Sequence, residues 1–67
     1  MKIRSFITKS RAGHYTVTVY REGEYYPFHI QNYVDNIVRA RELLARIRAA
    51  AESGAARYEG GLYGTSR

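Results

Sequence analysis

The segment from Tyr15 to Ile30, YTVTVYREGEYYPFHI, decides the fold, because it holds two alternating runs separated by the polar break Arg21–Glu24. Alternation of apolar and polar residues is typical of a β-strand with one buried face, and a short polar break with glycine is typical of a hairpin turn. We expect Thr18 to pair with Pro27, because this register gives both strands one continuous apolar face. The facing residues are then Tyr15, Val17 and Val19 on one strand and Ile30, Phe28 and Tyr26 on the other. The segment therefore predicts an antiparallel hairpin closed by a two- or four-residue loop.

Another strand is expected before this hairpin, where residues 2–8 also alternate. Pairing Thr8 with His14 leaves Lys9–Gly13 as the loop. The facing residues are then Ile3, Ser5 and Ile7 on the first strand and Val19, Val17 and Tyr15 on the second. The pattern predicts a three-stranded antiparallel meander whose second strand is central.

A helix is predicted from Tyr33 to about Ser53, after Asn32, whose side chain can cap the first turn. Apolar residues recur at three- and four-residue steps, at Tyr33, Ile37, Ala40, Leu44, Ile47 and Ala51. This stripe is broad enough to cover one face of the sheet. The opposite side carries the charged residues Asp35, Arg39, Glu42 and Arg46. Gly54 is suited to the left-handed position that ends a helix.

The predicted fold class is therefore α+β, a three-stranded antiparallel β-meander packed on one C-terminal α-helix (βββα). We expect residues 1–53 to form a single domain. Residues 54–67 are rich in glycine and lack periodicity, so they are expected to form a flexible C-terminal tail. The predicted core consists of Ile3, Ile7, Tyr15, Val17, Val19, Tyr26, Phe28, Ile30, Ile37, Leu44 and Ile47.

Length and composition restrict the function. A chain of 67 residues makes one small domain, too small for a deep cleft between large layers. It has no cysteine, which excludes disulfide frameworks and thiolate metal sites. It has neither an apolar run of about 18 residues that would span a membrane nor a signal-peptide pattern at its start, so we expect a cytoplasmic protein. The net charge of +5 favours a polyanionic or acidic partner, either nucleic acid or an acidic protein surface.

No catalytic or cofactor-binding group is predicted. The serines have no context that suggests activation, and no two carboxylates are expected to converge. His14 and His29 are expected to lie diagonally on the outer face of the sheet, where two histidines could contact a metal, but no third ligand of suitable type is near. Residues 60–66 lack the lysine, the preceding strand and the following helix of a phosphate-binding loop. We therefore predict no enzyme activity, no cofactor and no metal site.

The outer face of the sheet, which points away from the helix, is the predicted binding surface. Its aromatic rings can stack on bases or fill pockets of a partner, while its cations contact phosphates or carboxylates. The predicted partner-binding residues are Lys2, Arg4, Phe6, His14, Tyr20, Tyr25 and His29. In the alternative interpretation, Tyr20 and Tyr25 only form a cross-strand pair that steadies the hairpin.

Two helix residues are candidates for a basic rim beside this face. Arg41 and Arg48 are seven residues apart and lie close to the apolar stripe, so they could border the sheet. The alternative is that they cover the edges of the core with their methylene groups.

The stretch from Gly13 to Tyr25, GHYTVTVYREGEY, followed by a third strand and one helix, resembles the arm-type DNA-binding domains of tyrosine recombinases. The resemblance covers roughly residues 2–50 and implies a sheet that inserts into the major groove of DNA. Glu22 and Glu24 stand beside the turn glycine, where that family tends to have basic residues. This resemblance implies a free-standing small DNA-binding module.

In size, in its order of strands and helix, and in the hairpin from Tyr15 to Tyr25, the chain also resembles the small phage-encoded anti-CRISPR proteins. This resemblance implies a non-enzymatic inhibitor that binds a guide-RNA surveillance complex in the host cytoplasm. Members that imitate DNA are acidic, so a chain of charge +5 would instead bind an acidic protein surface of the complex or the nucleic acid that it holds. The inhibitor is the predicted function, and the DNA-binding module is the alternative.

Overall fold

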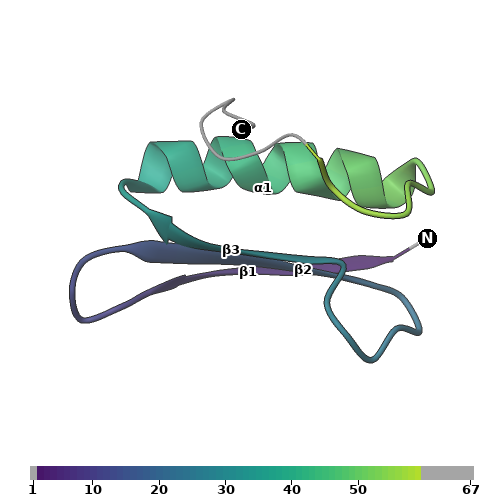
Figure 1. The fold of residues 1–67 in the computed structure, drawn as a ribbon, viewed down its shortest axis with the longest axis horizontal. Coiled ribbons are helices and arrows are strands. Elements are labelled where there is room, and N and C mark those ends of the chain that lie inside the picture. Colours follow the sequence, from purple (N-terminus) through teal and green to yellow (C-terminus); the bar gives the residue numbers. More distant parts are fainter. Residues whose placement is uncertain (1, 60–67) are drawn as a thin grey trace.

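Three antiparallel strands and one helix make up residues 2–59, the part of the chain that the computed structural model describes (Figure 1). The strands are β1 (Ile3–Lys9), β2 (Tyr15–Arg21) and β3 (His29–Val34), and the helix is α1 (Ile37–Glu52). The sheet has the order β1-β2-β3, and α1 covers one of its faces. The predicted βββα fold is confirmed. Within the described residues, no helix is long and apolar enough to cross a membrane.

The pairing of β1 with β2 differs from the prediction by two residues. Thr8 pairs with Thr16 rather than with His14. The reason is a turn that closes at Ser10, whose N–H donates to the carbonyl of His14 at 2.8 Å, with Gly13 in the left-handed conformation at a φ of 92°. Because side chains alternate with a period of two, this even shift leaves every residue of β1 and β2 on its predicted face.

The pairing of β2 with β3 is shifted by three residues, so the predicted pairing of Thr18 with Pro27 is wrong. Thr18 pairs with Ile30, and residues 22–28 form a loop. Pro27 has no N–H to donate to a strand partner, whereas the N–H of Phe28 donates to the carbonyl of Val19 at 2.7 Å. An odd shift exchanges the two faces of β3. Ile30 therefore lies on the outer face of the sheet.

The last residues of β3 occupy the place where the helix was predicted to begin. The register between β2 and β3 shifts between Tyr15 and Val17, which marks a β-bulge or a similar irregularity. Tyr33 takes a left-handed φ of 63° at this point. Val34 then pairs with Tyr15 and is fully buried. The chain thus stays in the sheet to Val34.

The helix starts at Ile37, four residues later than predicted. The side chain of Asn36 caps it, because its Oδ1 accepts a hydrogen bond from the N–H of Arg39 at 2.9 Å. The predicted cap, Asn32, instead lies in β3, where its Oδ1 accepts from the hydroxyl of Thr16 at 3.1 Å. The predicted end of the helix is confirmed, since Gly54 follows the C-cap with a φ of 85°.

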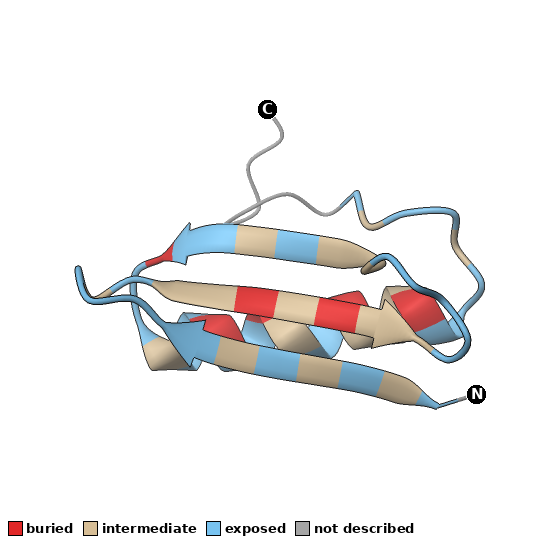
Figure 2. Ribbon diagram, turned by 90° about the horizontal axis from the view of Figure 1, so that it is seen from below, coloured by how far each residue is buried: buried red, intermediate tan, exposed pale blue. Residues whose placement is uncertain are grey.

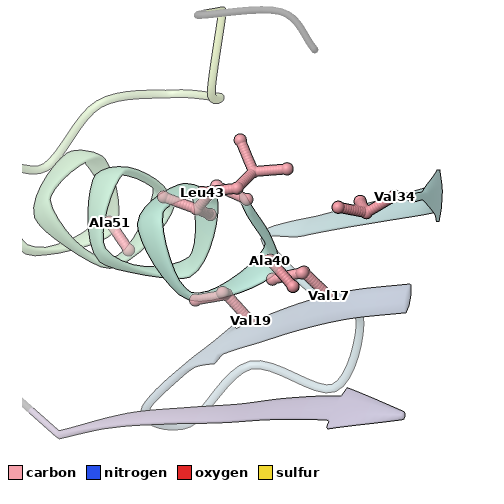
Figure 3. Packing of buried hydrophobic residues seen from close by; sticks show 7 residues of the cluster. Val17, Val19, Val34, Ala40, Leu43 and Ala51 are labelled. Atoms are coloured by element: carbon pink, nitrogen blue, oxygen red, sulfur yellow. The ribbon is translucent and has the colours of Figure 1, made fainter. Parts of the chain in front are cut away.

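The core lies between β2 and one stripe of α1 (Figures 2 and 3). Its buried members are Val17, Val19, Val34, Ala40, Leu43, Ile47 and Ala51. Six predicted core residues, Ile3, Ile7, Tyr15, Phe28, Ile37 and Leu44, are partly buried and pack around it. The predictions for Tyr26 and Ile30 are wrong, because the β2–β3 register leaves these side chains 76% and 48% exposed.

The chain continues to pack against the domain after α1. The carbonyl of Ala55 accepts a hydrogen bond from Nη1 of Arg21 at 2.9 Å. The ring of Tyr58 lies against the core, with its centroid 5.2 Å from that of His29. The packed part therefore extends past the predicted boundary at residue 53, whereas residues 60–67 of the predicted tail lie outside the described residues.

Candidate binding surface

An aromatic and basic cluster lies on the face of the sheet opposite α1. Arg4 pairs with Tyr20 across β1 and β2, and its Cζ atom lies 4.7 Å from the centroid of the Tyr20 ring. The ring of Phe6 meets that of Tyr20 edge to face, with centroids 6.1 Å apart. Phe6 and Ile30 both pair with Thr18, from opposite sides. We call Arg4, Phe6, Tyr20 and Ile30 the outer-face cluster.

The cluster is open to solvent. Phe6 is 47% exposed and Ile30 is 48% exposed. Figure 2 looks onto this face, and no described element lies in front of the strands there. Arg4 and Tyr20 support each other through a cation–π contact, which keeps the guanidinium on the sheet with its donors still available. The arrangement is suited to binding through apolar contacts with Phe6 and Ile30 and through the charge of Arg4.

Three predicted binding residues lie where the sequence places them. Arg4, Phe6 and Tyr20 are on the outer face because the shift between β1 and β2 is even. Lys2 comes just before β1 and is exposed, and its backbone N–H donates to Oε1 of Glu22 at 3.3 Å. Their role in binding stays a prediction.

Tyr25 is not part of the sheet. It lies in the β2–β3 loop, 85% exposed, with its ring 5.1 Å from that of Tyr26. The predicted cross-strand pair with Tyr20 is therefore wrong, and its cause is the same three-residue shift that leaves residues 22–28 as a loop. In Figure 1 this loop projects from the sheet on the side away from α1.

The two histidines do not lie together on the outer face, so that prediction is wrong. The odd shift of β3 turns His29 to the helix side, where its Nε2 lies 3.0 Å from Oε1 of Gln31. His14 is exposed in the β1–β2 loop, and its ring lies 5.7 Å from that of Tyr33. Among residues 2–59, no group of three or more histidine, cysteine, aspartate and glutamate side chains could hold a metal ion.

The predicted basic rim is not formed by both arginines. Arg48 is half-buried, and its Nη1 donates to the hydroxyl of Ser5 at 2.9 Å and to the carbonyl of Ile3 at 3.3 Å. It thus connects α1 to β1 on the helix side of the sheet. Arg41 is exposed on α1. The alternative interpretation, in which such a residue covers the edge of the core, fits Arg48.

Sequence reasoning missed Arg21 and Ile30. Arg21 is largely buried on the helix side, with its Cζ atom 4.6 Å from the centroid of the Phe28 ring and its Nη2 3.3 Å from Oε2 of Glu24. Ile30, a predicted core residue, belongs to the outer-face cluster. Pro27 was the available signal, because a proline has no N–H to donate to a neighbouring strand and so counts against its pairing with Thr18.

Arg57 lies in the segment after α1, outside the outer-face cluster, and pairs with a neighbouring acid. Its Nε donates to Oε2 of Glu59 at 2.8 Å. This hydrogen bond, together with the attraction between the two charges, raises the pKa of Arg57 above the usual value for arginine. The effect is confined to this exposed pair, which is not part of the outer-face cluster.

Comparisons with known proteins do not assign the chain to a family. No family model matches it, and neither do the curated proteins and the solved structures. The likeness to recombinase arm-type domains and to anti-CRISPR proteins accordingly stays a prediction.

Proposed function

We propose that this chain is a non-catalytic inhibitor of the phage type, which binds a host CRISPR ribonucleoprotein complex through the outer-face cluster. The observation that supports this proposal is the pair of half-exposed apolar side chains, Phe6 and Ile30, beside the stacked Arg4 and Tyr20. An aromatic centre with an adjacent arginine has the composition of the residues that dominate protein interfaces.

Burial of this cluster would supply binding free energy. Complete burial of an apolar side chain of this size stabilises by about 1.5–3 kcal/mol relative to full exposure, and Phe6 and Ile30 each have about half of their surface left to bury. Tyr20 is already held by Phe6 and Arg4, so it would lose little conformational entropy on binding. The cluster is therefore already ordered before a partner binds.

The proposed partner is an acidic protein surface of the complex. Lys2 and Arg4 place positive charge beside the apolar centre, and the whole chain carries +5. Complementary charge raises the association rate and fixes the orientation of the two surfaces. Phe6 and Ile30 favour protein over nucleic acid, because the backbone of nucleic acid offers charge but little apolar surface.

A free-standing DNA-binding module is the second candidate. It is favoured by the open outer face, where Arg4 is accompanied by the hydroxyls of Thr8 and Thr18, which can hydrogen-bond to base edges or phosphates. The two candidates differ in their response to salt. Affinity for DNA falls steeply with salt through counterion release, whereas affinity at an apolar protein interface changes less.

A capture experiment tests the proposal. The full chain is immobilised and exposed to lysate of a bacterium with an active CRISPR system, with and without nuclease, and the captured proteins are identified. We expect capture of the CRISPR complex, and loss of about 2 kcal/mol or more of binding free energy in Arg4→Ala and Phe6→Thr. Threonine keeps the strand propensity at residue 6, so the melting temperature should stay close to that of the wild type.

Arg46→Ala is the matched control, because Arg46 is an exposed arginine of α1 away from the outer face. If Arg46→Ala abolishes capture while Arg4→Ala and Phe6→Thr retain it, the proposed site is wrong. Capture of nucleic acid alone, with a steep dependence on salt, would support the DNA-binding module instead.

A further inference from the structure

Tyr33 combines an unfavourable backbone conformation with an exposed side chain. Its φ of 63° lies in the left-handed region, where residues other than glycine, asparagine and aspartate are uncommon. Its side chain is 74% exposed, so the core gains little from it. Glycine or asparagine would allow the same backbone with less strain. An exposed aromatic ring at this position therefore has a better explanation in a role at the surface than in packing of the core.

The ring of Tyr33 has an aromatic neighbour. The ring of His14 lies 5.7 Å away at an interplanar angle of 78°. The pairing of Tyr15 with Val34 holds the two segments side by side, and the N–H of His14 donates to the hydroxyl of Ser10 at 3.3 Å. Two exposed rings, one from the β1–β2 loop and one from β3, thus meet at the end of the sheet that carries this loop.

This end of the sheet is also basic. Lys9 ends β1, with its Nζ 5.8 Å from the centroid of the Tyr15 ring, and Arg11 is exposed in the loop that follows. Neither cation is in an ion pair with another described residue. Asp35, two residues after Tyr33, is the acidic residue nearest to it in the sequence. Its Oδ1 lies 3.7 Å from Nε of Arg39, a cation of α1. The loop that carries Glu22 and Glu24 lies at the opposite end (Figure 1).

We propose that Lys9, Arg11, His14 and Tyr33, which we call the basic-aromatic end, bind single-stranded nucleic acid. A base stacks on Tyr33, and the flanking phosphates contact Lys9 and Arg11. Every base has a flat face that can stack on an aromatic ring, and unpaired strands leave these faces accessible. An acidic peptide would use the two cations but not the exposed ring. The site is on a different surface from the outer-face cluster and does not depend on the proposed function.

Fluorescence anisotropy with labelled oligothymidine and oligouridine of about 15 nucleotides tests this inference, because sites of this kind span about 4–16 nucleotides. We expect the full chain to bind both at low salt. Tyr33→Gly should lower the affinity at least about fivefold, as expected from the loss of one stacked base, while the melting temperature stays the same or rises. Tyr33→Phe should retain the affinity, since it keeps the ring.

Lys9→Gln and Arg11→Gln should each lower the affinity and reduce the slope of log K against log salt by about 0.7, the value for one phosphate contact on a single strand. Arg46→Gln on α1 is the charge-matched control and should leave that slope nearly unchanged. The inference is overturned if neither oligonucleotide binds, if Tyr33→Gly binds as tightly as the wild type, or if polyglutamate competes as well as oligothymidine.

Discussion

Two asparagines four residues apart, Asn32 and Asn36, show how one side chain sets the boundary of an element. Both are good N-cap residues, and each is followed by residues that could continue a helix. Only Asn36 accepts the hydrogen bond from the first turn, at 2.9 Å from the N–H of Arg39. Asn32 is used instead by the sheet, through the hydroxyl of Thr16. Sequence alone does not separate the two because capping propensity is local, whereas the choice is made by tertiary contacts.

A matched pair of substitutions tests which of the two asparagines caps α1. Asn36→Ala should lower the free energy of unfolding by about 0.5–2 kcal/mol, because it leaves a first-turn N–H of α1 without its partner. Asn32→Ala removes one exposed side-chain hydrogen bond and should have a smaller effect. Urea denaturation of both variants measures the difference. A larger loss in Asn32→Ala would contradict the position of the cap.

At the scale of elements, the sequence predicted the strands better than their pairing. The faces of β1 and β2 were right even though their register was shifted, because the shift is even. β3 was assigned the wrong face, because the apolar residues Tyr26, Phe28 and Ile30 alternate as convincingly as a buried strand does. The even shift of β1 and the odd shift of β3 also determine which residues of the candidate site could be predicted. Arg4, Phe6 and Tyr20 could be placed on the outer face from the sequence, whereas the positions of Ile30 and His29 could not.

The register of β3 can be tested with two alanine substitutions. Val34 is fully buried, so Val34→Ala should lower the free energy of unfolding by about 1–3 kcal/mol through lost apolar burial and the cavity left behind. Ile30 is about half exposed on the outer face, and Ile30→Ala should have a clearly smaller effect despite removing more atoms. Thermal denaturation of both variants gives the comparison. The reverse order would support the pairing of Thr18 with Pro27 that the sequence predicts.

At the scale of the whole molecule, the sheet has two different proposed binding surfaces and one structural seam, where α1 and the segment after it are joined to the sheet. The outer-face cluster is apolar and aromatic, and the basic-aromatic end carries unpaired positive charge beside a strained tyrosine. The seam lies on the helix side, where Arg48 connects α1 to β1 and Arg21 holds the carbonyl of Ala55. From the sequence, Arg48 could be placed at the edge of the core, but not the partners of Arg48 and Arg21, because each of these contacts joins residues more than thirty positions apart.

The segment after α1 should therefore contribute to stability, although its composition resembles that of a tail. Tyr58 packs against the core beside His29, so Tyr58→Ala should lower the free energy of unfolding by about 1–3 kcal/mol, less than for a completely buried aromatic ring. Its hydroxyl is buried without a hydrogen-bond partner among the described residues, a state that costs free energy. Tyr58→Phe removes that hydroxyl and keeps the ring, and should leave the stability unchanged or raise it. If Tyr58→Ala unfolds at the same denaturant concentration as the wild type, residues 54–59 do not pack on the domain in solution, and a boundary at residue 53 would describe the molecule better.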